Sequence, residues 1–143
     1  MILNPEVWGP HYWFVLHSIA LTYPKKPNAI IRKKYYSFIQ DLPLFLPDSK
    51  ISNQFSHLIK TYSVAPYLDS RDTFMKWIHF IHNKINIAIG KPTMLYQEAI
   101  KNYYKNYNLK DIKHYENMRQ REKILYAGII ISLCGLSYFL YDK

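Results

Sequence analysis

The sequence predicts an all-α protein, a compact four- to five-helix bundle followed by a C-terminal transmembrane helix. Apolar residues recur every three or four positions along several segments, which is the period of a helix with one buried face. Strand-like alternation is absent, and short proline-containing turns separate the segments. With 143 residues, 49% of them hydrophobic, the chain can bury one modest core.

The first three helices are expected within residues 10–62. Residues 10–23 are apolar nearly all round, as a central helix would be. Residues 28–42 and 48–62 are amphipathic, each with one apolar stripe at helical spacing. The stripes consist of Ile31, Tyr35, Phe38, Ile39 and Leu42 in the first, and of Ile51, Phe55, Leu58, Ile59 and Tyr62 in the second.

Two more helices are expected before the C-terminal segment. Residues 70–89 carry a buried face of isoleucine, phenylalanine and tryptophan, and Ser70 is placed to cap their first turn. A shorter helix is predicted from just after Pro92 to about Tyr107. The bundle is therefore expected to occupy residues 1–108.

The C-terminal segment predicts a membrane anchor. Residues 124–141 carry no charge, and at about 1.5 Å per residue they would reach roughly 27 Å, close to the thickness of a bilayer core. Residues 109–123 before them form a basic juxtamembrane segment, while only Asp142 and Lys143 follow. This imbalance places the N-terminal domain on the cytoplasmic side of a single-pass membrane protein. The alternative is a buried C-terminal helix of the globular domain.

The charge of the chain limits its partners. Its formal net charge of +9 would fit nucleic acid, an anionic membrane or an acidic protein, but the lysines are spread along the sequence. Aromatic residues alternate with lysines over 101–110, a pattern that occurs in nucleic-acid binding. We favour the alternative in which Tyr103 and Tyr107 pack the helix after Pro92 and the lysines face solvent, so nucleic acid is not the expected partner.

One stripe of the helix at 70–89 carries neutral polar side chains. His79, His82, Asn83 and Asn86 are neighbours along one side, beside the apolar face. A helical wheel places His82 and Asn86 at the edge of the core and points His79 and Asn83 further out. Such groups suit a planar heteroaromatic ligand, because imidazole can stack and amides can pair with ring nitrogens. Ordinary structural histidines are the alternative, and a zinc site is not expected, since no cysteine or carboxylate shares this face.

Two segments resemble the flavin-binding signatures of the ERV/ALR family of FAD-dependent sulfhydryl oxidases. They are WGPHYWFVLHSIALTYP at residues 8–24 and FMKWIHFIHNKINIAIGKP at residues 74–92. The pattern WGPxxWxxLH, YP, WxxxxHNxxN and GKP is met in order and at the family's spacing. The chain is most similar to the short members encoded by large cytoplasmic DNA viruses.

The resemblance implies a helical bundle that binds FAD, commonly as a homodimer. The residues that it assigns to the flavin part or its linker are Trp8, Trp13, His17 and Tyr23. Those assigned to the adenosine part are His82, Asn83 and Asn86, and Lys91 would lie near the polar portion of the cofactor.

The chain departs from the family at the redox centre. Such oxidases carry a CxxC beside the flavin, because one thiolate attacks and a second thiol resolves. Asp48 and Ile51 stand at those two positions, and the single cysteine, Cys134, lies in the expected membrane span. Asp48 is placed to cap the next helix, and Ile51 continues its apolar stripe. No catalytic residue is therefore assigned.

These observations predict a catalytically degenerate, membrane-anchored relative of the oxidases. It would serve as a structural or assembly component, such as a minor capsid or inner-membrane protein of a virion, with protein partners in that assembly. The alternative is an FAD-linked thiol oxidase that uses cysteines of a partner.

Overall fold

The computed structural model describes residues 3–107 and 109–141, and every regular element in them is helical. This confirms the all-α prediction. The elements, in order, are α1 (Pro5–Thr22), α2 (Ala29–Asp41), the 3-10 helix η1 (Leu42–Phe45), α3 (Ser49–Thr61), the 3-10 helix η2 (Ala65–Tyr67), α4 (Arg71–Ala88), α5 (Tyr96–Tyr104) and α6 (Leu109–Tyr141). The chain divides between Tyr103 and Tyr104 into two compact units.

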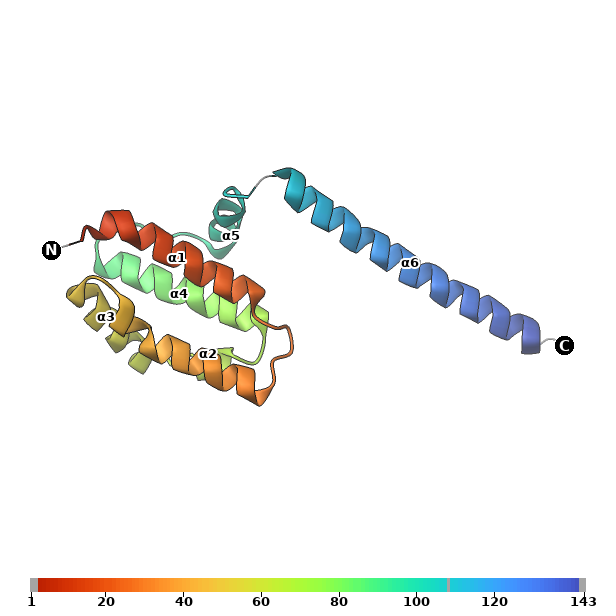
Figure 1. The fold of residues 1–143 in the computed structure, drawn as a ribbon, viewed down its shortest axis with the longest axis horizontal. Helices are drawn as coiled ribbons and strands as arrows, with labels where there is room; N and C mark the ends of the chain where they lie inside the picture. Colours follow the sequence, from red (N-terminus) through yellow and green to blue (C-terminus); the bar gives the residue numbers. More distant parts are fainter. Residues whose placement is uncertain (1–2, 108, 142–143) are drawn as a thin grey trace. The chain divides into compact units, whose positions relative to one another are not determined.

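The first unit is a helical bundle in which α1 and α4 run side by side, with α2 and α3 against them (Figure 1). Trp77 and Phe74 of α4, Phe55 of α3, Ile39 of α2 and Tyr23 after α1 are among its most buried side chains. Hydrophobic side chains from α2, α3, α4 and the end of α1 thus meet in one core. Their burial drives the association of the helices.

The predicted helix starts are confirmed by three capping side chains. Asn28 accepts a hydrogen bond from the Ile31 N–H, and Ser70 accepts one from the Thr73 N–H. Asp48 does the same for α3, accepting from the Ile51 N–H at 2.8 Å. Each cap satisfies an amide that the first turn leaves without a helical partner.

Two helix boundaries differ from the sequence-based prediction. α1 begins at Pro5 rather than Pro10, because Asn4 caps it by accepting from the Glu6 N–H at 2.9 Å. Pro10 therefore lies inside the helix, where it lacks an N–H to donate. α5 begins only at Tyr96, because the residues after Pro92 remain non-helical and are hydrogen-bonded to α4.

The second unit is dominated by α6, a 33-residue helix. The expected juxtamembrane segment at 109–123 and the expected span at 124–141 both lie in this one helix. Among the residues that the structure describes, none of the helices meets the length and hydropathy that a membrane crossing requires, so the transmembrane helix is not identified there.

Candidate functional site

Three rings from two helices meet where α1 packs against α4. The His82 ring stacks on Trp13, with the ring centroids 4.0 Å apart and the planes 10° from parallel. His17 Nε2 lies 3.3 Å from His82 Nδ1, so one of these nitrogens donates to the other. The structure thus brings together three of the residues that the sequence assigns to the site.

Both histidines of this pair are held in the neutral form. Burial, helped by repulsion from His79, lowers the pKa of His17 to about 4. Burial, helped by repulsion from His17 and His79, lowers the pKa of His82 to about 3. A neutral imidazole carries one donor and one acceptor. At neutral pH the group therefore presents aromatic faces and uncharged hydrogen-bonding atoms.

His79 departs from the helical-wheel prediction, which pointed it away from the core. It is buried, with 9% of its surface exposed, because Tyr96 at the start of α5 packs edge-on against it at 5.4 Å. This burial lowers the pKa of His79 as well. The wheel failed here because it could not include a helix that returns over α4.

Asn83 and Asn86 contact the segment that joins α4 to α5, residues 89–95, here called the α4–α5 connection. The Asn83 side chain donates to the Met94 carbonyl at 2.9 Å and accepts from the Met94 N–H at 3.1 Å. Asn86 donates weakly to the Pro92 carbonyl, at 3.4 Å. Both amides are therefore engaged with the protein's own backbone.

Lys91 and Trp8 lie near the start of α1. The Lys91 ammonium is 3.9 Å from the carboxylate of Glu6, and both side chains are well exposed, so this ion pair contributes little to stability. Trp8 donates to the Leu3 carbonyl and packs edge-on against Tyr12. These residues could contact a polar group at this end of the bundle.

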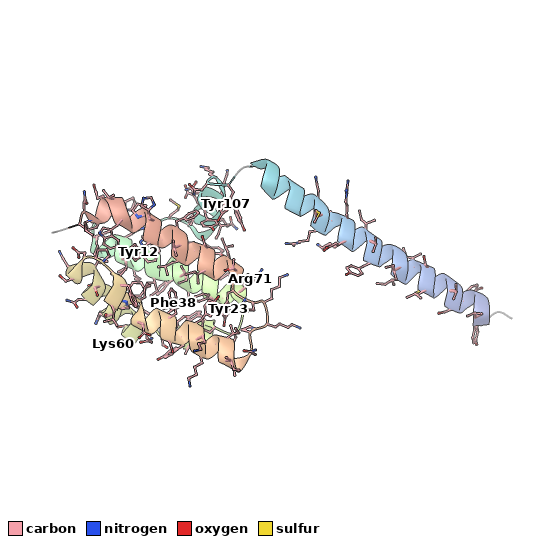
Figure 2. The ribbon with its side chains drawn as sticks, in the orientation of Figure 1. Tyr12, Tyr23, Phe38, Lys60, Arg71 and Tyr107 are labelled. Carbon is pink, nitrogen blue, oxygen red and sulfur yellow. The ribbon has the colours of Figure 1, made fainter. Side chains whose placement is uncertain are left out.

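Tyr23 lies just after the C-terminal end of α1 (Figure 2), and its ring contacts Tyr35 and Phe74. It is fully buried, and its hydroxyl donates to the Leu68 carbonyl at 2.7 Å. The Arg71 side chain in turn donates to the Tyr23 carbonyl. Through Arg71, Tyr23 therefore links the chain after α1 to the start of α4.

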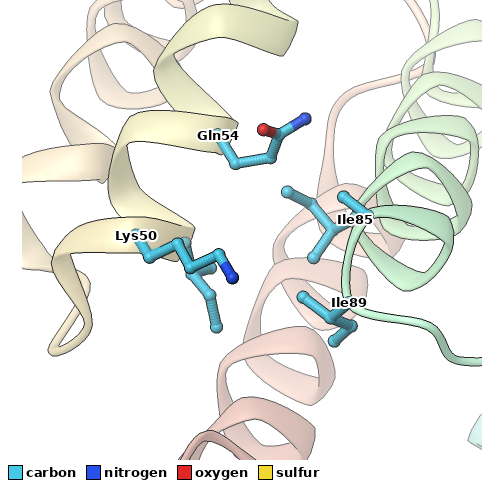
Figure 3. A pocket seen from close by; sticks show the side chains of 6 residues that line it. Lys50, Gln54, Ile85 and Ile89 are labelled. Carbon is cyan, nitrogen blue, oxygen red and sulfur yellow. The ribbon is translucent and has the colours of Figure 1, made fainter.

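The first turn of α3 carries the two positions where the family's cysteines are expected. Asp48 is the N-cap described above, and Ile51 lines a small pocket, about 30 Å³ in volume, between α3 and α4 (Figure 3). The pocket is lined by Lys50, Ile51, Gln54, Ile85, Ala88 and Ile89. Its walls are mostly apolar, and none of them carries a thiol.

Sequence reasoning missed several residues around this site. Tyr12 donates to the Phe45 carbonyl at 2.7 Å, which ties α1 to the turn before α3. Its position four residues after Trp8, on the same helical face, was a usable signal. Nothing in the sequence indicated Lys50 or Met94, because their roles depend on how α3 and the α4–α5 connection pack against α4.

The part of the chain that the structure describes contains no side chains grouped to bind a metal ion and no pair of thiols. No group of three histidine, cysteine or carboxylate side chains is placed to hold a metal ion there. Cys134, the single cysteine of the sequence, is exposed on α6. The donor set around Trp13 and His82 consists instead of neutral rings and amides.

The first unit is a helical bundle in which two adjacent helices hold stacked, neutral rings that offer flat faces and uncharged hydrogen-bonding atoms. The chain belongs to the Erv1/Alr family, whose model matches residues 10–105. This confirms the resemblance found in the sequence. A probable FAD-linked sulfhydryl oxidase of Acanthamoeba polyphaga mimivirus is 36% identical over 99 residues, covering 68% of this chain and 69% of the relative.

Further similarities agree with this family. A putative FAD-linked sulfhydryl oxidase of Invertebrate iridescent virus 6 is 30% identical over 97 residues, covering 64% of this chain and 87% of the relative. The FAD-binding domain of Erv1 from Saccharomyces cerevisiae has a similar fold, with a TM-score of 0.66 at 24% identity, covering 74% of this chain and 99% of that one. The bundle is thus an Erv1-type fold.

Proposed function

We propose that this protein is an FAD-binding member of the Erv1/Alr family that lacks its own thiol chemistry and serves as a membrane-anchored structural or assembly component. The observation that carries the proposal is the first turn of α3. There Asp48 caps the helix and Ile51 lines the neighbouring pocket, at the positions where the family's redox cysteines are expected.

The side chains between α1 and α4 fit FAD. A planar heterocycle can stack on the Trp13–His82 pair, and neutral imidazole at His17 and His82 supplies hydrogen bonds without a charge to desolvate. Ile85 and Ile89 lie one and two turns further along α4 and line the apolar pocket. Helical spacing places these apolar side chains on the same side of α4 as His82, so they could contact the part of the cofactor that extends beyond the stacked rings.

A bound FAD supplies a two-electron acceptor, but this chain offers it no dithiol. Dithiol oxidation needs an attacking thiolate and a second thiol to resolve the intermediate. The Asp48 carboxylate accepts a hydrogen bond from the Ile51 N–H, and the Ile51 side chain is a hydrocarbon, so neither can exchange disulfides. The single cysteine, Cys134, has no second cysteine in the same chain with which to form a dithiol.

The C-terminal part of α6 supports anchoring in a membrane. Residues 124–141 carry no charge, and basic residues precede them at Arg119, Arg121 and Lys123. Within its own unit this segment is uncovered: Ile130, for example, is 61% exposed. We place the N-terminal bundle on the cytoplasmic side, as a homodimer, with protein partners in a membrane-associated or virion assembly; nucleic acid is not among the proposed partners.

The experiment uses the full chain purified in detergent. Flavin absorbance that coelutes with the protein, without oxygen consumption on addition of a dithiol, supports the proposal. Sedimentation with membranes through an alkaline wash tests the anchor; release into the supernatant would contradict it. Steady dithiol oxidation by the chain alone would overturn the structural assignment.

The alternative function is an FAD-linked thiol oxidase whose dithiol comes from a partner. The small pocket beside Ile51 favours it, because a partner's cysteine would have to approach FAD from that side of α3. Oxygen consumption that appears only when a cysteine-bearing partner is added would replace the structural role with this one.

A further inference from the structure

The polar stripe of α4 holds a segment of the protein itself. The α4–α5 connection runs back along α4, and three contacts follow one another in antiparallel order. Asn86 meets Pro92 at 3.4 Å, Asn83 meets Met94 at 2.9 and 3.1 Å, and His79 meets Tyr96 with ring centroids 5.4 Å apart. The stripe therefore fixes the path of the chain between two helices.

Asn83 makes the strongest of these contacts. Its amide binds the Met94 backbone in both directions, and its Nδ2 also lies 3.1 Å from His79 Nε2. An amide has two donor hydrogens and one carbonyl oxygen with two acceptor positions. Both donors of Asn83 are thus used within the protein, which leaves one acceptor position.

The connection determines where α5 begins and therefore where α5 packs. Tyr96 starts α5 two residues after Met94 and packs against His79. Further along α5, the Tyr103 hydroxyl lies 2.7 Å from Ser18 Oγ, and the Tyr103 ring is 6.4 Å from His17. α5 therefore forms a wall beside the imidazoles that face the proposed FAD site.

We propose that Asn83 is a positioning residue for FAD: it fastens the α4–α5 connection and so holds α5 against α1 and α4, rather than binding the cofactor through its own amide. This inference rests on the proposed function. The backbone at the start of the connection supports this role. Gly90 adopts a φ of 73°, which residues with a side chain rarely adopt, so the chain is turned back along α4 at this point. The Lys91 N–H directly after it donates to the Asn86 carbonyl at 2.7 Å.

The test measures FAD affinity and amide hydrogen exchange in the full chain in detergent. For Asn83→Ala we expect at least a tenfold weaker affinity, faster release of FAD and faster exchange of the Met94 amide. Asn83→Asp keeps the acceptor for the Met94 N–H but loses the donors to the Met94 carbonyl and to His79, and it turns a negative oxygen toward that carbonyl, so its affinity should also fall. The matched control is Asn53→Ala, at an exposed position of α3.

The outcomes separate the inference from the function on which it depends. If Asn83→Ala lowers the melting temperature but leaves FAD affinity unchanged well below it, Asn83 has only a structural role and the inference is wrong. Unchanged Met94 exchange would also overturn it. A wild-type chain that binds no FAD would overturn the proposed function, and the inference with it. If Asn83→Ala does not fold, an affinity of Asn83→Asp equal to wild type would still overturn the inference.

Discussion

His82 of α4 lies face to face with Trp13 of α1, with ring centroids 4.0 Å apart. The contact does two things at once. It closes the interface between the two neighbouring helices, and it holds the imidazole in an orientation in which its Nδ1 meets His17. In the proposed function, one side chain therefore couples the stability of the bundle to its affinity for FAD.

His82→Ala is expected to weaken FAD binding by at least tenfold. The substitution removes the stacking surface and one hydrogen-bonding partner, each of which contributes about 1 kcal/mol. Quenching of flavin fluorescence on titration with the full-length protein measures the change. His57→Ala, at an exposed histidine of α3, is the matched control and should bind as wild type does. Equal affinity in the two variants would remove His82 from the site.

Stability is expected to fall as the pH drops below about 6.5. The pKa values of His17 and His82 are lowered to about 4 and about 3, mainly by burial. Between these values and the ordinary histidine pKa, the unfolded chain therefore binds protons that the folded chain does not bind. This contribution to stability is complete above the ordinary histidine pKa and is lost progressively as the pH falls toward 4 and then 3. Each histidine contributes at most about 1.4 kcal/mol per pH unit in this range.

Urea unfolding at about pH 7.5 and about pH 5 measures this dependence. His82→Gln removes one of the two titrating groups and should make the stability less dependent on pH, whereas His57→Gln should not. A pH dependence that is identical in the two variants would show that His82 does not carry the effect.

The sequence alone predicted most of the helices but only part of the site. Caps and helical periodicity are local, so Asn28, Asp48 and Ser70 could be identified as helix starts before any packing was known. The burial of His79 could not be predicted in this way, because it depends on Tyr96, a residue of another helix. The bonds between the Asn83 amide and Met94 could not be predicted either, because they exist only once the chain turns back after Gly90.

Asp48→Ala is expected to lower the free energy of unfolding by about 1 kcal/mol, because the Ile51 N–H loses its side-chain acceptor. Asp48→Ser keeps an N-cap oxygen and should remain within a few tenths of a kcal/mol of wild type. Urea unfolding of the two variants provides the comparison. Equal destabilisation of both would mean that the negative charge at the helix N-terminus, and not the cap bond, accounts for the effect.

The double variant Asp48→Cys with Ile51→Cys is expected to confer dithiol oxidation on the full chain. A thiol at the N-cap of α3 would have a lowered pKa, and its partner would lie three residues on, next to the pocket between α3 and α4. Each disulfide formed releases two electrons and two protons, which oxygen takes up as hydrogen peroxide. Oxygen consumption should exceed that of either single variant at least tenfold.

The matched control introduces two cysteines with the same CxxC spacing at positions away from the pocket. Asn53→Cys with Ser56→Cys places a CxxC further along α3, at positions that do not line it. This control should form no more peroxide than wild type, although it carries the same number of thiols. If the double variant at 48 and 51 binds FAD and forms its disulfide yet consumes no oxygen, the loss of the cysteines does not explain the proposed lack of activity. The cause would then have to lie among the side chains that hold the cofactor, beginning with His17 and His82.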